Sequence, residues 1–140
     1  MLKYVVNALK ILGISFFRFR PIPRVWIYWL VAVNFGCLYF IMHIEAQVVL
    51  AVTCLAVVLQ SVIYERTGFT RILGTTHLAW IPMFAWLATR IDEMAATPGM
   101  VEWAAVLFAT NAVSFVIDVI DATRYARGER APYYRWEVTG

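Results

Sequence analysis

A mostly apolar stretch from residue 100 to residue 122 limits the possible folds of this chain more than any other feature. It is long enough, at about 1.5 Å per helical residue, to cross the roughly 30 Å hydrocarbon core of a membrane. Its polar residues Asn111, Ser114, Asp118 and Asp121 follow one another at intervals of three, four and three positions, which places them on one helix face. Lipid offers such side chains no partners, so this face is predicted to lie against other helices.

The composition indicates that the whole chain belongs in a membrane. Hydrophobic residues make up 62% of the 140 residues, and the mean hydropathy is +0.70. A soluble domain of this length cannot bury that much apolar surface. Charged residues, 15% of the chain, lie between the apolar runs rather than along them. The sequence therefore predicts an all-α fold, an integral membrane four-helix bundle formed by one domain over residues 1–140.

Four apolar runs are predicted to be the spans, and two further segments are predicted to flank them. The spans are 25–42, 46–64, 72–89 and 100–122, and residues 124–140 form a basic, aromatic tail. In residues 1–20, Lys3, Asn7 and Lys10 recur at helical spacing within an apolar background. This pattern is typical of an amphipathic helix that lies in the membrane interface. Pro21 and Pro23 should separate this helix from the first span.

The distribution of positive charge predicts the orientation of the spans. Of the 12 lysines and arginines, all but Arg90 fall in the N-terminal segment, in the loop between the second and third spans, or in the tail. Because cytoplasmic segments are enriched in lysine and arginine, both termini are predicted to be cytoplasmic. The net charge of +3 is explained by this asymmetry, and no nucleic-acid partner is expected.

Three polar residues are predicted to lie at similar depth in the cytoplasmic half of the membrane. Gln60, His77 and Asp118 each stand four to six residues from the nearest cytoplasmic end of their span. A pair between His77 and Asp118 would be either a structural lock between helices or a proton or cation site open to the cytoplasm. Arg71 and Arg124 are the possible charge partners of Asp118 and Asp121.

The sequence shows no pattern typical of a cofactor, a metal site or a catalytic centre. Cys37 and Cys54 lie inside apolar runs without metal-ligand spacing, and His43 and His77 are predicted to lie near opposite membrane surfaces. We therefore expect no catalytic residues, no metal and no cofactor. An enzymatic activity is left open but is not favoured.

Resemblances to known families give little further information about activity. Four spans resemble the small multidrug transporters, but the first span here carries Asn34 and no acidic residue. The run from Phe115 to Tyr125 resembles segments of bacterial membrane proteins, which implies a bacterial inner-membrane location and no particular activity.

Two functions remain as hypotheses from the sequence. The first is a non-enzymatic subunit or scaffold that associates with itself or with another membrane protein, in contact with the bilayer and with anionic lipids through its basic segments. The alternative is a channel or transporter whose polar pathway is lined by Asn111, Ser114, Asp118 and Asp121 and completed by His77 and Gln60.

Overall fold

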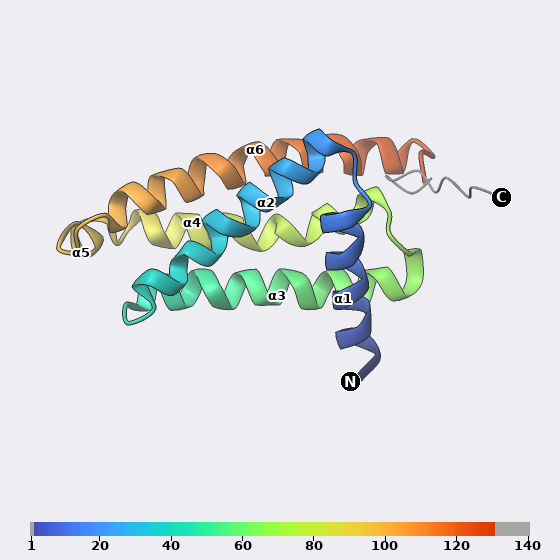
Figure 1. Ribbon diagram of the computed structural model, residues 1–140. Helices are drawn as coiled ribbons and strands as arrows, with labels where there is room; N and C mark the ends of the chain where they lie inside the picture. The colour runs from blue at the N-terminus through green and yellow to red at the C-terminus, as the bar shows by residue number, and fades with distance from the viewer. Residues whose placement is uncertain (1, 131–140) are drawn as a thin grey trace.

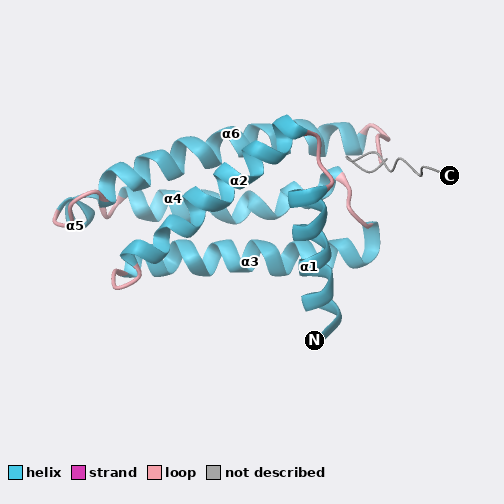
Figure 2. Ribbon diagram, in the orientation of Figure 1, coloured by secondary structure: helices cyan, strands magenta, loops and turns pink. Residues whose placement is uncertain are grey.

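The computed structural model describes residues 2–130, and in this range every regular element is a helix, with short loops between the helices and no strand (Figure 2). Three helical segments are long and apolar enough to cross a membrane: Pro21–Phe40, Ile44–Thr67 and Met100–Ala126. The elements in chain order are α1 (Leu2–Phe17), α2 (Pro21–Phe35), the 3₁₀ helix η1 (Gly36–Phe40), α3 (Ile44–Thr67), the 3₁₀ helix η2 (Arg71–Ala79), α4 (Trp80–Ala88), α5 (Ile91–Ala95) and α6 (Met100–Ala126).

The long elements lie lengthwise beside one another, and α1 lies across them. Figure 1 shows α3, α4 and α6 extending along the same long dimension, with α2 running obliquely across them and α1 crossing α3 steeply at one end. α6 packs along η2, and α1 packs against α3 and α2. The part of the predicted tail at 131–140 lies outside the described residues.

Proline and glycine set the ends of the first elements. Pro21 occupies the first turn of α2, where a missing backbone N–H leaves no hydrogen bond unmade, and it separates α2 from α1. α2 continues directly into η1, so the two together form one segment of 20 residues. Gly68, at φ +66°, ends α3 with its N–H on the carbonyl of Tyr64.

The segment predicted as a third span over 72–89 is helical but is not one continuous α-helix. Its first half is the nine-residue 3₁₀ helix η2, and α4 follows from Trp80. Pro82 is the third residue of α4, so its missing N–H falls in a first turn and interrupts no α-helical hydrogen bond. The proline therefore stands where the 3₁₀ helix changes into the α-helix.

Apolar side chains fill the interior near α5 and also cover the outside. Met100, Leu107, Val49 and Cys37 are fully buried, and Trp80 and Met83 pack with them. In contrast, Val58, Phe108 and Val116 are each more than half exposed on the outer faces of α3 and α6. An apolar surface outside a packed apolar core is the pattern expected of helices that contact lipid.

The helices extend beyond the apolar runs that predict them. α6 continues to Ala126 and α3 to Thr67, a few residues past the predicted limits at 122 and 64. The difference has a simple cause: apolar content marks the part of a helix suited to lipid, while backbone hydrogen bonding continues through the polar residues that follow.

Candidate functional site

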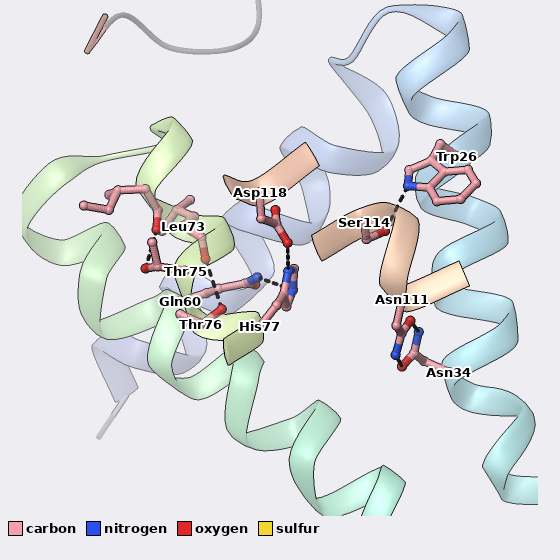
Figure 3. A network of polar contacts seen from close by, with 11 residues as sticks. Trp26, Asn34, Gln60, Leu73, Thr75, Thr76, His77, Asn111, Ser114 and Asp118 are labelled. Carbon is pink, nitrogen blue, oxygen red and sulfur yellow. Dashed lines mark hydrogen bonds and ion pairs between the residues drawn. The ribbon is translucent and has the colours of Figure 1, made fainter. Parts of the chain in front are cut away.

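Five polar residues from three elements meet at the end of the molecule where α6 finishes. We call them the inner cluster: Gln60 of α3, Arg71 and His77 of η2, and Asp118 and Asp121 of α6. His77 Nδ1 lies 2.6 Å from Asp118 Oδ2, and Gln60 Nε2 lies 3.3 Å from His77 Nε2 (Figure 3). Arg71 Nη1 donates to Asp121 Oδ1 at 2.6 Å. Two acid–base contacts therefore join η2 to α6, and Gln60 joins α3 to η2.

The 3₁₀ form of η2 is what brings both of its ionisable residues onto α6. A 3₁₀ helix repeats every three residues, so Arg71, Gly74 and His77 stand in one row, and Trp80 continues the row into α4. The rings of His77 and Trp80 stack with their centroids 4.0 Å apart, as eclipsed neighbours do. In an α-helix, Arg71 and His77 would point about 120° apart, and only one of them would face α6.

The threonines of η2 contribute to its local conformation. The hydroxyl of Thr75 donates to the carbonyl of Ile72 at 2.7 Å, and that of Thr76 donates to the carbonyl of Leu73 at 3.0 Å (Figure 3). Both bonds run three residues back along the chain, which is the reach of a 3₁₀ turn. These polar side chains therefore satisfy their own helix rather than facing lipid.

Gly74 allows η2 to approach α6 closely. A Cβ atom at this position would overlap the carboxyl group of Asp118, so the carboxylate lies directly against the glycine backbone. Any larger residue at position 74 would push apart the two elements that the His77–Asp118 contact joins.

A second group of polar contacts joins α6 to α2. The amides of Asn34 and Asn111 donate to each other at 2.9 and 3.1 Å, and both residues are buried. The indole N–H of Trp26 donates to Ser114 Oγ at 3.1 Å (Figure 3), and the indole of Trp29 donates to Thr110 Oγ1 at the same distance. We call these six residues the α2 seam.

Ion pairs also lie at the two ends of the long helices. At one end, Arg90 donates to Glu45 at 2.9 Å, and Glu45 is buried. At the other end, Arg124 pairs with Glu129 at 2.7 Å. The hydrogen bond from Arg124 holds the pKa of the exposed Glu129 carboxyl below its ordinary value, so this residue is anionic at neutral pH.

The structure divides the residues proposed from the sequence between these two groups. His77 contacts both Gln60 and Asp118, which agrees with the similar membrane depth predicted for the three residues. Asn111 and Ser114 face α2 instead and belong to the α2 seam. The polar stripe of α6 is therefore shared by two neighbours and does not line one continuous path.

The proposed charge partners are also distinguished by the structure. Arg71 pairs with Asp121, and both side chains are largely buried. Arg124 pairs with Glu129, which was not among the partners predicted for it.

Several contacting residues have no role in the sequence analysis, although signals for some of them exist. Asn34 is the only amide in the first span, which marks it as a candidate partner for Asn111. The spacing of Trp26 and Trp29 places both on one helix face, but an aromatic belt gives the same pattern. The importance of Gly74 could be found only from the repeat of three that it shares with Arg71 and His77.

A groove lies beside the inner cluster. Its volume is about 340 Å³, it lies between η2 and α6, and its lining includes Gly74, Phe115 and Asp118. Within residues 2–130, no group of three or more histidine, cysteine, aspartate or glutamate side chains could hold a metal ion. Thr75 and Thr123 also line the groove, but their hydroxyls donate to backbone carbonyls of their own helices. The chemistry available in the groove is therefore mainly that of one carboxyl group among apolar walls.

Comparison with known proteins finds no matching family model, no matching curated sequence and no matching solved structure.

Proposed function

We propose that this chain is a small four-span protein of a bacterial inner membrane that acts as a non-enzymatic subunit or scaffold of a membrane assembly. One observation carries the proposal. Thr110, Asn111, Ser114, Asp118 and Asp121, the polar residues that face inward from α6, each have a hydrogen-bond or ionic partner within the chain. Side chains paired in this way hold helices together, which is the first need of a scaffold.

The reach of η2 supports a fourth span. A 3₁₀ helix rises about 2.0 Å per residue and an α-helix about 1.5 Å. The nine residues of η2 and the nine of α4 therefore extend roughly 31 Å, close to the thickness of the hydrocarbon core. An α-helix of the same 18 residues would extend only about 27 Å. The 3₁₀ form thus lets a short segment cross beside the longer helices.

The position of α1 supports an interfacial helix on the cytoplasmic side. α1 crosses the long elements at the end where α3 finishes (Figure 1). Asn7 donates to Glu65 Oε2 at 2.7 Å, and Lys3 pairs with the same carboxylate at 3.4 Å. At the opposite end Arg90 is neutralised by Glu45. The difference in positive charge between the two ends, from which the cytoplasmic side is inferred, is therefore larger.

The outer face of α6 supports association with another helix. Ala105, Ala109 and Ala112 are all exposed, and the first two are separated by four positions. Small residues at this spacing allow the backbones of two membrane helices to approach closely. The partner is then a second copy of this chain or another membrane protein that supplies a complementary helix.

The mass of the protein extracted with its surrounding lipid tests this proposal. We expect particles with more than one polypeptide, and we expect Ala109→Leu to reduce the assembled fraction several-fold, because leucine keeps helix backbones apart. Ile117→Leu, about 80° away around α6, is the matched control and should leave the assembly intact. A single polypeptide per particle in the unchanged protein would contradict the proposal.

The groove beside Asp118 favours a second candidate function, a channel or transporter. Because Asp118 lines an open groove, it is the residue through which a proton or cation would pass. Flux into liposomes that contain the purified protein separates the two functions. A flux that Asp118→Asn abolishes supports transport, and the absence of flux in the unchanged protein removes this candidate.

A further inference from the structure

The Asp118 carboxyl group of the inner cluster is engaged by the chain through one of its two oxygens. The amide nitrogen of Gln60 can only donate, so His77 Nε2 accepts from it at 3.3 Å. The ring proton is then on His77 Nδ1, which donates to Asp118 Oδ2 at 2.6 Å. Arg71 pairs with Asp121 instead, so His77 is the side chain that contacts Asp118 within the cluster.

The two oxygens of this carboxylate have different surroundings. Oδ2 of Asp118 is engaged by His77, whereas Oδ1 accepts no hydrogen bond from any residue in the part of the chain described. Oδ1 lies against the Gly74 backbone, and both residues line the groove. The volume of about 340 Å³ is sufficient for a small polar head with part of an acyl chain.

The groove combines one anion with apolar walls. Leu78, Phe115, Val119 and Ala122 line it, and the neighbouring Val116 is exposed on the outer face of α6. Asp118 lies three residues before Asp121, which is about 4.5 Å deeper along the helix. From Asp118 the lining continues through Ala122 to Ala126, where α6 ends. A ligand that enters from the lipid near this end therefore meets apolar walls and then a carboxylate.

We propose that this groove binds a phospholipid with a primary ammonium head group, and that Asp118 Oδ1 accepts a hydrogen bond from the ammonium. The head group supplies three N–H donors and a positive charge, which suit a carboxyl oxygen that has no donor within the described chain. The acyl chain lies along Phe115, Val119 and Ala122, which offer it the same apolar contact as the bilayer. The inference rests on the membrane orientation of the proposed function, but it does not require the chain to be a subunit.

Native mass spectrometry of the purified protein with added lipids measures this binding directly. The probes are phosphatidylethanolamine, phosphatidylcholine, which has no N–H donor, and phosphatidylglycerol, which has no cation. We expect phosphatidylethanolamine to bind about tenfold more tightly than either of the others, the ratio expected for one hydrogen bond to a charged group. Free ethanolamine is added separately, and tight binding of this amine alone would show that the lipid portion is not recognised.

Two variants and a control assign the binding to the groove. Asp118→Asn keeps the shape of the side chain but removes the charge, and it should abolish the preference for phosphatidylethanolamine. Ala122→Leu fills the groove and leaves His77 and Asp118 unchanged in the sequence, so it tests the site even where the asparagine variant does not fold. Glu102→Gln removes an exposed carboxylate from the other end of α6 and should have no effect.

Equal affinity for the three lipids, or an unchanged preference in a folded Asp118→Asn or Ala122→Leu variant, would overturn the proposal. These outcomes are independent of the particle mass that tests the subunit function. If the protein is a monomer that binds phosphatidylethanolamine selectively, the result supports the lipid site and contradicts the subunit function.

Discussion

Arg71 and His77 lie on the same face of η2, six residues apart, because six residues complete two turns of a 3₁₀ helix. Each residue contacts a different aspartate of α6. The two contacts therefore depend on the helical phase between positions 71 and 77, and this dependence can be tested by changing the phase alone.

Insertion of one alanine after Gly74 should break one of the two contacts. The extra residue turns Arg71 by about 120° relative to His77, so only one of them can still face α6. We expect a loss of about 3 kcal/mol in the free energy of unfolding, because an aspartate loses its partner while it remains largely buried. Equilibrium unfolding in mild detergent measures the loss. An alanine inserted after the exposed Ala96 is the control, and equal stability of the two insertions would show that the phase is unimportant.

Gly74→Ala should destabilise the protein by about 1–3 kcal/mol, because the added methyl group overlaps Asp118 and forces η2 and α6 apart. Gly13→Ala is the matched substitution in α1, where a Cβ meets nothing within 4 Å. It should stabilise the helix by roughly 0.5–1 kcal/mol. The unfolding midpoints of the two variants should move in opposite directions, and a shift of the same sign in both would contradict the close approach.

Asn111→Leu should cost more alone than together with Asn34→Leu. The single change leaves the amide of Asn34 without its partner inside the helix packing, at a cost of about 1–2 kcal/mol. The double change removes both polar groups and should recover most of this loss. A double-mutant cycle from equilibrium unfolding gives the coupling energy, and purely additive effects would mean that the two amides do not stabilise each other.

Cysteine labelling in intact cells should show opposite sides for Asp92 and Arg127. The native Cys37 and Cys54 are first replaced by alanine, and a single cysteine is then introduced at position 92 or 127, both of which are exposed. A maleimide that cannot cross the membrane should label position 92 in intact cells and position 127 only after permeabilisation. The reverse pattern would invert the proposed orientation.

The sequence contained enough information to place some contacts and not others. The similar depth of Gln60, His77 and Asp118 follows from counting residues to the charged ends of their segments, because over four to six residues the rises of an α-helix and a 3₁₀ helix differ by only about 3 Å. Apolar content likewise predicts the three segments that are long enough to cross a membrane. Such counting gives the level of a residue, but it does not give the direction in which its side chain points.

Two features of the site were not predicted because they depend on the direction in which side chains point. The 3₁₀ form of η2 changes the angle between successive residues, and no apolar pattern in a segment with Gly74, Thr75 and Thr76 distinguishes it from an α-helix. The pairing of Asn111 with Asn34 depends on which helix lies beside α6, a tertiary choice that the stripe on α6 leaves open.

The contacts of α6 also have a consequence for biosynthesis. Asn34, His77 and Arg71 are separated by 77, 41 and 50 positions from the residues that they bind in α6. A ribosome that adds roughly 5–20 residues per second makes α6 seconds after those residues. During that interval the nascent helices must remain in the bilayer through their apolar surfaces alone. The arrival of the last helix therefore changes a set of separately inserted segments into one fixed structure.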